Sequence, residues 1–509
     1  MAQSKGFATR TILDIENGFG MEPSVKAGKS VPFNSNGVVG TRELQDPGTI
    51  TGTRNAPDPF MGNMDANGDL VVPADLKAFG WYLRAMFGAP VTTGSGTYTH
   101  VFKISGNTMP SLVLERQFLS LASRAAMRVS GCRINRWAFN PTGGGDELVH
   151  TFGIIGANET KILPPSTLPY GAAVGAKTFT GAGTVGAASF TGSGLNDATS
   201  GGTFTGSPSG SYRVQIDSTG ATDTFKWSKD GGATWVAETV AITGAAQTLE
   251  KGVTVTFAAT TGHTSADRWD IAVTASLEDL TLGTANWGLG TTNYKVQVDA
   301  AAATDTFKWS NDGGSTWKAT GVAMTGAAQE LENGVTVLFA ATTGHALNTY
   351  WTFTTTGPTD LAATMSRIVN AQCSAMAEGG SGFTQARDLS LEVAFGLDTE
   401  DYRLAGAGIR SDLPEGMVAV TGTLKAIFAD FALLDKAIAE TESSLQLTWT
   451  KSTHSLVILL PEVKYSRKGP AVDGPKGIMQ ELAFKAYYGN GTDASAIKVT
   501  LVNDVASYA

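Results

Sequence analysis

The chain has 509 residues, of which 61 are glycine and 16% are charged, and its formal net charge is −9. This length predicts three or four domains, and many glycines with few charges favour short strands and turns over long helices. The negative charge argues against a nucleic-acid-binding protein, which needs clustered Lys and Arg.

Other simple features exclude further classes. Cys132 and Cys373 are the only cysteines, too few for a disulfide scaffold or a zinc site. No run approaches the roughly 18 apolar residues of a membrane span, and residues 1–13 contain no apolar signal region. We therefore expect a mainly β protein, made as a soluble chain in the cytosol, with no membrane segment.

The first half, residues 1–167, is predicted to be a β sandwich or barrel with one helix packed on it. Pro73 should open the helix and Gly88 should end it. Strands should follow from Ser111 and over residues 148–155. The apolar face of the helix is predicted to consist of Leu76, Phe79, Leu83 and Met86.

A repeated insert follows the first half. Residues 168–193 are rich in Gly, Thr, Ser and Ala, which predicts a linker or a weak partial module. Residues 194–275 and 276–358 are two copies of one module, and 39 of the 60 positions from 212 to 271 match the residue 82 positions later. Their period-2 alternation predicts a small β sandwich of roughly immunoglobulin size for each copy. Residues 165–358 carry −6 of the net charge of −9, so the outer segments carry −3.

Each module contains an Asp-box pattern, a hairpin motif found in sialidases and other β-rich proteins. In that motif Asp and Ser bond turn amides, Gly adopts unusual backbone angles and Trp packs beneath, which predicts a structural role. The residues are Ser228, Asp230, Gly232, Thr234 and Trp235 in the first copy and Ser310, Asp312, Gly314, Thr316 and Trp317 in the second.

The second half, residues 359–509, has the same order of predicted elements as the first. Asp430 should cap a short helix, and strands should follow from Ser455 and over residues 482–488. The helix presents Leu433, Leu434, Ala437 and Ile438. Short motifs also recur in order: Glu16-x-x-Phe19-Gly20 with Glu392-x-x-Phe395-Gly396, Gly40-x-Arg42 with Gly408-x-Arg410, Pro47-Gly48 with Pro414-x-Gly416, and Thr51-Gly52-Thr53 with Thr421-Gly422-Thr423. The two halves are therefore predicted to share one ancestry.

Several segments of the outer halves carry a family likeness: Gly131–Asn135, Arg410–Met417, Val418–Ile427, Ser455–Tyr465 and Val499–Asp504. They resemble the major tail tube proteins of siphovirus-type, long-tailed bacteriophages. The resemblance implies a structural virion protein whose rings, each with six such folds, stack into a tube through which the genome passes. Two folds per chain would make a ring of three chains, with pseudo-sixfold symmetry.

The resemblance also implies partners and a location. The chain would assemble with itself in the host bacterial cytoplasm, and would meet a tape measure protein and tail terminator and baseplate proteins in the phage tail. DNA would pass the lumen transiently, past a neutral or acidic wall. The inserts would decorate the exterior of the tube.

Long loops are expected to make the contacts between subunits. They are residues 25–60 and their counterpart 398–415, in which Arg42 and Arg410 are predicted to be equivalent. Arg42, Arg410 and Asp412 are the candidate contact residues. Replacing Arg410 by Glu is expected to impair polymerisation and to leave a folded subunit.

Two alternatives compete with the tail tube. The duplicated Trp residues of the insert could bind cell-surface glycans, since aromatic faces suit sugar rings. A sialidase is the third reading, but it needs an arginine cluster for the substrate, and the insert contains only Arg213 and Arg268. The sequence has no P-loop, G-x-S-x-G, C-x-x-C or H-E-x-x-H motif, so we expect no catalytic residues, cofactor or metal site.

Overall fold

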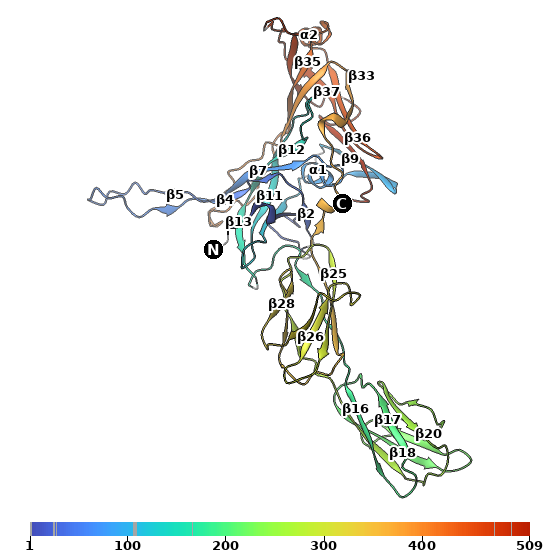
Figure 1. Ribbon diagram of the computed structural model, residues 1–509. Coiled ribbons are helices and arrows are strands. Elements are labelled where there is room, and N and C mark those ends of the chain that lie inside the picture. The colour runs from blue at the N-terminus through green and yellow to red at the C-terminus, as the bar shows by residue number, and fades with distance from the viewer. Residues whose placement is uncertain are drawn as a thin grey trace. The chain divides into compact units, whose positions relative to one another are not determined.

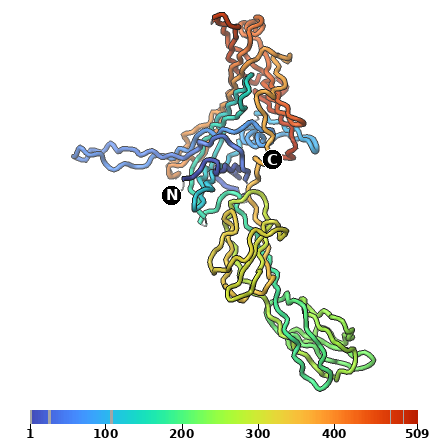
Figure 2. Tube along the Cα trace, in the orientation of Figure 1, coloured from blue at the N-terminus to red at the C-terminus, as the bar shows by residue number. Residues whose placement is uncertain are grey.

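Figures 1 and 2 present the computed structural model of the chain, which describes residues 3–23, 26, 28–104, 109–164, 166–472, 474–489 and 491–508. Within these ranges the chain is mainly β, as predicted, with two α-helices. It forms two compact units. Unit 1 comprises Met1–Gly171 and Gly357–Ala509, and unit 2 is Ala172–Thr356.

The two outer halves of the chain fold together as unit 1. The first half consists of η1 (Gly6–Ala8), β1 (Thr9–Ile15), β2 (Lys29–Val31), β3 (Ser35–Asn36), β4 (Val39–Thr41), β5 (Leu44–Gln45), β6 (Phe60–Met61), β7 (Asp65–Pro73), α1 (Phe79–Phe87), β8 (Val91–Ser95), β9 (Thr97–Lys103), β10 (Leu112–Phe118), β11 (Ala125–Phe139), β12 (Val149–Gly156) and β13 (Asn158–Ile162). The second half consists of β31 (Thr359–Asp360), η2 (Ala362–Thr364), η3 (Asn370–Gln372), β32 (Cys373–Glu378), β33 (Ser381–Gly382), β34 (Ala386–Ala394), β35 (Ala419–Ile427), α2 (Ala432–Ile438), β36 (Ser443–Lys451), β37 (His454–Tyr465), β38 (Met479–Ala486) and β39 (Lys498–Asn503).

Eight strands of unit 1 pair side by side in one antiparallel series. Their order is β4–β7–β12–β11–β34–β35–β38–β37. The first four strands belong to the first half and the last four to the second half, and α1 follows β7 as α2 follows β35. Each half therefore contributes the same four-stranded unit, and the halves are tandem copies of one fold.

The predicted apolar face is buried in α1, although this helix starts later than expected. Leu76, Phe79, Leu83 and Met86 are all buried. β7 continues to Pro73, so this residue ends a strand and does not open the helix. The Asp75 carboxylate instead accepts the amides of Lys77 and Ala78, at 2.9 and 2.6 Å, in the turn before Phe79. In α2, Leu433, Leu434 and Ala437 are buried, but Ile438 is 48% exposed. The N-cap position of α2 is occupied by Phe431, so Asp430, the predicted cap, lies one residue before the cap position and accepts the amide of Ala432 at 2.9 Å.

Strand pairing assigns the equivalent residues of the two halves. Ala66 of β7 lies opposite Gly40 on one side and Gly156 on the other. Val420 of β35 lies opposite Val393 on one side and Ala486 on the other. Ala66 and Val420 are both buried, and β7 holds the same place in the first half as β35 holds in the second. The equivalent pairs are therefore Ala66 with Val420, Gly40 with Val393 and Gly156 with Ala486.

This register corrects the motif matches drawn from the sequence. Arg42 directly follows β4, whereas Arg410 lies near the end of the connection between β34 and β35. Thr51–Thr53 lies in the connection between β5 and β6, whereas Thr421–Thr423 lies in β35. The matched motifs are Gly-, Pro- and Thr-containing turns, which recur by composition, and Arg42 and Arg410 are not equivalent.

Unit 2 contains two modules of two sheets each. Its strands are β14 (Ala173–Val174), β15 (Thr178–Thr180), β16 (Thr184–Thr191), β17 (Ala198–Gly202), β18 (Gly210–Ser218), β19 (Thr224–Ser228), β20 (Ala237–Ala241), β21 (Gln247–Thr248), β22 (Val253–Phe257), β23 (Arg268–Thr274), β24 (Leu280–Leu282), β25 (Thr291–Ala300), β26 (Thr306–Ser310), β27 (Ala319–Ala323), β28 (Gln329–Glu332), β29 (Val335–Phe339) and β30 (Tyr350–Thr356). Sheets β16–β23–β18–β19–β20 and β17–β22–β21 enclose one core, and β14/β15–β30–β25–β26–β27 and β24–β29–β28 enclose the other.

The segment 168–193 is not a linker. In β15, Phe179 pairs with Trp351 of β30, and in β16, Phe190 pairs with Trp269 of β23. Residues 179–181 and 190–192 both read Phe-Thr-Gly, so the same three residues begin in β15 of one module and in β16 of the other. The chain passes through the sheet of the second module before it builds the first, so the first module is inserted within the second.

Candidate assembly surfaces

The two halves of unit 1 meet along β11 and β34, whose pairing we call the seam. Trp137 lies opposite Val393 and Ala138 opposite Glu392. Just beyond β34, the amide of Phe395 donates to the carbonyl of Asn135 at 2.8 Å. Because the bonds are main-chain bonds, the sheet runs from one half to the other without a break.

A second pairing joins the halves elsewhere. The β8–β9 hairpin of the first half places β9 against β39 of the second, from Tyr98 opposite Asn503 to Lys103 opposite Lys498. In the second half only residues 439–442 separate α2 from β36, so the described chain has no equivalent hairpin there. The two halves therefore differ at their outer edges.

Arg410, a predicted contact residue, lies buried between the halves. Its guanidinium donates to the carbonyl of Thr399 at 2.7 Å, the carbonyl of Gly156 at 3.0 Å and the Asp65 carboxylate at 2.5 Å. The side chain is only 5% exposed. These bonds occupy Arg410 within its own chain, so the prediction that it faces another subunit is wrong.

The other two predicted contact residues also lie where the halves meet. Arg42 is exposed and donates to the carbonyl of Ala407 at 2.9 Å. Asp412 lies 3.4 Å from the guanidinium of Arg133, which also bonds the carbonyl of Leu413. The structure thus brings all three residues to contacts between the halves of one chain, and contacts of Arg42 or Asp412 with another copy stay a prediction.

Arg133 is a residue that the sequence analysis missed. It is 8% exposed on its side chain and reaches from β11 to the connection between β34 and β35, 3.7 Å from Glu415. The available signal was a charged residue between the apolar residues Cys132 and Ile134 of a predicted strand. Such a residue is expected to have a buried partner.

A long hairpin leaves unit 1 between β4 and β7. Figure 1 shows it, at β5, reaching away from the rest of unit 1 on the side opposite the β8–β9 hairpin. Leu44 pairs with Met61, and Gln45 with Phe60. Ile50 is 96% exposed, and Leu44, Phe60 and Met61 are also exposed. Of the loop predicted at 25–60, residues 25 and 27 lie outside the described residues.

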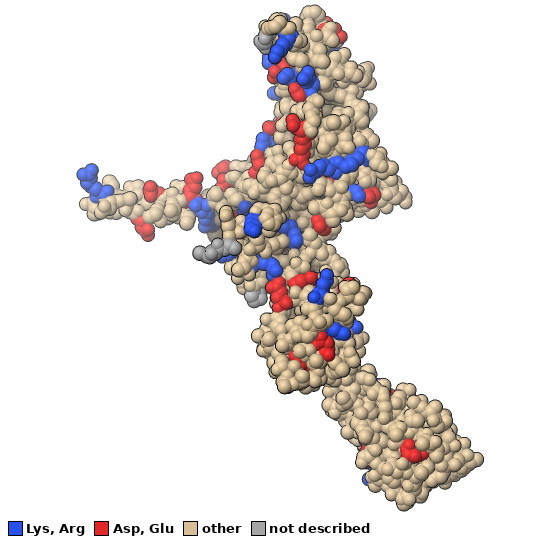
Figure 3. All heavy atoms as spheres, in the orientation of Figure 1, with Lys and Arg blue, Asp and Glu red and all other residues tan. Residues whose placement is uncertain are grey.

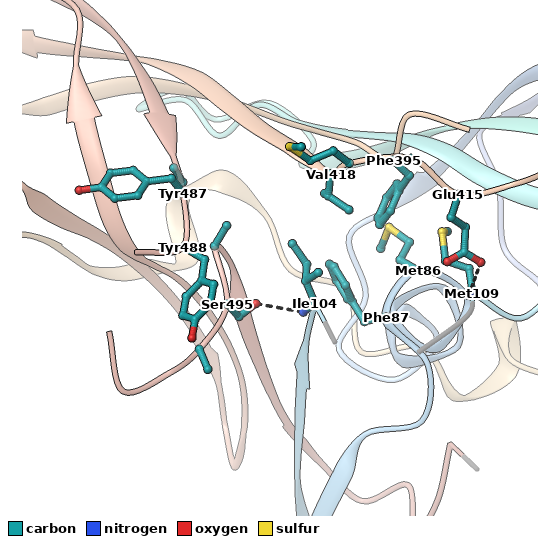
Figure 4. A pocket seen from close by; sticks show the side chains of 15 residues that line it. Met86, Phe87, Ile104, Met109, Phe395, Glu415, Val418, Tyr487, Tyr488 and Ser495 are labelled. Atoms are coloured by element: carbon teal, nitrogen blue, oxygen red, sulfur yellow. Dashed lines mark hydrogen bonds between the residues drawn. The ribbon is translucent and has the colours of Figure 1, made fainter. Parts of the chain in front are cut away.

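A groove with an apolar lining lies between the halves (Figure 4). It has a volume of about 840 Å³. Met86, Phe87 and Ile104 of the first half face Phe395, Val418 and Tyr488 of the second. The Glu415 carboxylate at its edge accepts the amide of Met109 at 2.6 Å. Of these six apolar side chains, Met86, Phe87 and Phe395 are buried and only Tyr488 is exposed.

Comparison with known proteins identifies the family. A family model described as phage tail tube protein matches residues 7–206 and, a second time, residues 196–486. The chain belongs to the phage tail tube protein family. Each match includes most or all of one half of unit 1, in agreement with the tandem fold. No curated protein matches the chain.

In this tail tube protein the Asp-box side chains are bonded within their own turns. Asp230 accepts the amide and hydroxyl of Thr234 at 2.9 and 2.5 Å, and Ser228 accepts the amide of Gly232 at 2.9 Å. The bonds from Ser228 and Thr234 hold the pKa of Asp230 well below its usual range. Gly232 has a φ of 98°, which favours glycine. Ser310, Asp312, Gly314 and Thr316 repeat this geometry in the second module.

The Trp residues of the Asp boxes are half-buried and covered by cations. Lys226 lies 4.3 Å from the ring centre of Trp235, and Lys308 lies 4.3 Å from that of Trp317. Trp227 and Trp309 are buried. The ammonium groups occupy ring faces that a sugar would need.

Each module of the tail tube protein also contains a buried histidine held by two aspartates. His263 bonds Asp223 at 2.9 Å and Asp197 at 3.0 Å, and His345 bonds Asp305 and Asp279 in the same way. Burial alone would lower the pKa of His263, but the bonds to Asp197 and Asp223 raise it above the ordinary value. The sequence offered one signal, the repeat of the histidine at equivalent positions.

Among the residues that the structure describes, no group of three His, Cys, Asp or Glu side chains is placed to hold a metal ion. The described helices are too short or too polar to cross a membrane.

Proposed function

We propose that three copies of this tail tube protein close a ring with pseudo-sixfold symmetry, and that such rings stack into the tube through which the phage genome is delivered. The observation that carries the proposal is the seam, where one copy of the fold continues the sheet of the next within a single chain. Three chains with two folds each supply six folds. A sheet that repeats in this manner closes into a barrel when its last edge meets its first.

The edges of the sheet support closure. β4 ends the eight-stranded series at one side. At the other side β37 pairs with β36 only as far as Val463, so the residues that follow Tyr465 are the free edge. Unpaired strand edges promote association with another chain, and a ring would use both of these edges.

The hairpin between β4 and β7 is suited to stacking. Exposure of its apolar side chains to water is unfavourable. Burying them would stabilise a contact by roughly 25 cal/mol per Å² of apolar surface. The groove between the halves is lined by apolar side chains, of which Met417 and Tyr488 are exposed. We assign the hairpin to the contact between rings, where it would pack on a copy in the neighbouring ring.

The solvent-facing side of the eight-stranded sheet is compatible with a lumen that does not retain DNA. Arg136 lies 3.1 Å from Asp69 and 3.6 Å from Glu392, and Lys425 lies 3.9 Å from Asp388. Figure 3 likewise shows cations and anions interspersed on the visible face of unit 1. Cations that are paired with carboxylates bind phosphates weakly, because their charge is already neutralised and they displace fewer of the counterions condensed on the DNA.

The insert is proposed to lie on the exterior of the tube. Unit 2 leaves unit 1 after Gly171 and returns at Gly357, outside the eight-stranded series. Its addition therefore interrupts no strand of the ring. Glycan binding by its Trp residues is not favoured, because Lys226 and Lys308 cover Trp235 and Trp317.

Negative-stain microscopy of the purified chain tests the proposal. Tubes of uniform diameter with threefold ring averages are the expected result. Discrete monomers under all conditions would contradict a tube protein, and rings of six chains would contradict the stoichiometry.

A further inference from the structure

The seam within one chain is a template for the contact between chains. In the seam, residues 136–139 of β11 extend past the end of β10 and pair with residues 391–394 of β34. The ring proposed above, on which this inference rests, repeats that contact between the second half of one chain and the first half of the next. Equivalent residues should therefore form it.

The equivalent of β34 in the first half is β4. Gly40 corresponds to Val393, since they lie opposite Ala66 and Val420. Val39 therefore corresponds to Glu392, and Thr41 to Ala394. The side chains of Val39 and Thr41 are exposed, so a strand can approach this edge without disturbing the core.

The equivalent of the β11 extension lies just after β37. Arg136 is opposite Gly153 of β12, which corresponds to Ala483 of β38 because Gly156 corresponds to Ala486. The amide of Ser466 donates to the carbonyl of Ala483 at 2.8 Å. Ser466 thus takes the place of Arg136, and Lys468 takes that of Ala138.

We propose that residues 466–469 of one chain pair antiparallel with residues 38–41 of the next, with Ser466 opposite Thr41 and Lys468 opposite Val39. Residues 466–469 are exposed. In the seam, one edge of residues 136–139 pairs with β34, and within the described chain no strand pairs with the equivalent edge of residues 466–469. β36 begins at Ser443, opposite Val463, just as β10 begins at Leu112, opposite Cys132, in the first half. The neighbouring chain fills the gap.

The free edge of β4 is protected before assembly. The amide of Gly40 donates to the Glu159 carboxylate at 3.1 Å, and the amide of Val38 donates to the Asn36 side chain at 3.1 Å. Side chains therefore satisfy the groups that a strand would use. Closing the ring exchanges these bonds for main-chain bonds to residues 466–469.

A designed disulfide tests this register. Phe395 and Asn135 form a hydrogen-bonded pair, so Ala138 and Glu392, three residues away on each strand, form a non-hydrogen-bonded pair with Cα atoms about 4.5 Å apart. This separation suits a disulfide. The variant Val39→Cys with Lys468→Cys, in a Cys373→Ser background that keeps the buried Cys132, should link neighbouring chains when assembled tubes are oxidised.

Denaturing electrophoresis without reductant reads the result. The expected outcome is loss of the single-chain band and appearance of a species of three chains, which reductant reverses. The matched control Ala138→Cys with Glu392→Cys should close its disulfide inside one chain and remain a single chain. Lys468→Cys with Thr160→Cys, which places the second thiol on exposed β13, should not link chains.

The alternatives are distinguishable. Tubes that form from the Val39→Cys, Lys468→Cys variant but stay unlinked would overturn the register and leave the ring intact. Equal linking through Thr160→Cys would also overturn it. Absence of rings from the wild-type chain would overturn both the register and the proposed function.

Discussion

Arg410 and Asp65 form an ion pair of 2.5 Å between the second and the first half of the chain. The arginine is almost completely buried and also donates to two carbonyls, those of Thr399 and Gly156. Its role in one chain is therefore to hold the connection between β34 and β35 onto the first half.

Replacing Arg410 by Glu should destabilise the subunit itself. The substitution places a buried carboxylate beside Asp65 and leaves the two carbonyls without their donor. Asp65 is 47% exposed, so most of the loss comes from the two carbonyls left without a donor, at about 1–3 kcal/mol each. Urea unfolding of the unassembled subunit would measure the loss.

Arg403→Glu is the matched control for Arg410→Glu. Arg403 lies in the same connection, is 67% exposed and pairs only with Asp401. Exposed pairs contribute about 0–1 kcal/mol, so its loss should be small. Equal unfolding midpoints for the two variants would contradict the burial argument for Arg410.

Removing residues 172–356 should leave unit 1 folded and able to assemble. The ends of the cut are close together, because a Cβ on Gly171 would lie 2.4 Å from the ring of Pro358. A short glycine linker can therefore join them. Electron microscopy of the deletion should still find tubes, with a smooth exterior.

A longer deletion, of residues 168–358, should fail where the shorter one succeeds. The carbonyl of Leu168 accepts from Arg128 at 2.8 Å, and the amide of Tyr170 donates to the buried Glu115 at 2.8 Å. Loss of the buried Tyr170 side chain alone costs about 3–5 kcal/mol. If both deletions assemble equally well, this anchor has no structural importance.

The tandem fold could be predicted from the sequence because its signals are local. Period-2 strands and the apolar face of α1 depend on neighbouring residues, and the structure confirms them. The equivalence of the halves could not be predicted correctly, since it depends on which strands pair. Arg42 and Arg410 shared a motif but not a position.

The errors at the candidate site have the same cause. From the sequence alone, Arg410 is interpreted as a solvated loop charge. In the structure it bonds Asp65, which is far away in the sequence. The segment 168–193 reads as a linker because β15 pairs with β30, a strand about 170 residues later. Long-range pairing of this kind leaves almost no local signal in composition.

The stability of the first module should depend on pH in a predictable direction. The folded-state pKa of His263 is raised, so its contribution is full below the unfolded pKa of about 6.5 and is lost as pH rises through the folded value. The pKa of Asp223 is lowered: burial opposes this shift, but bonds from Gly220 and His263 outweigh it. Its contribution is present above about pH 3.9 and is lost as pH falls.

Calorimetry of the full chain would test the pH dependence. The thermal unfolding transition of the insert is the one that is absent from the chain lacking residues 172–356. Its midpoint temperature should be highest between about pH 4 and 6.5. Raising the pH to 9 should lower that midpoint by a few degrees. His263→Gln should remove most of the change above pH 6.5, and an unchanged pH profile in that variant would contradict the assignment.

Gly422 marks a point in the sheet where no side chain fits. A Cβ there would lie 2.0 Å from the carbonyl oxygen of Ser390 in β34 and 2.4 Å from the ring of Phe484 in β38. Gly422→Ala must push the strands apart beside the seam, at a cost of about 1–3 kcal/mol.

Gly382→Ala is the matched control, since nothing lies within 4 Å of its Cβ position in β33. That control should be neutral or slightly stabilising, because alanine restricts the unfolded chain. Urea unfolding of both variants compares them, and electron microscopy then asks whether Gly422→Ala, once folded, still closes rings. Because the strain lies in β35, one strand from β34, ring yield should fall together with stability.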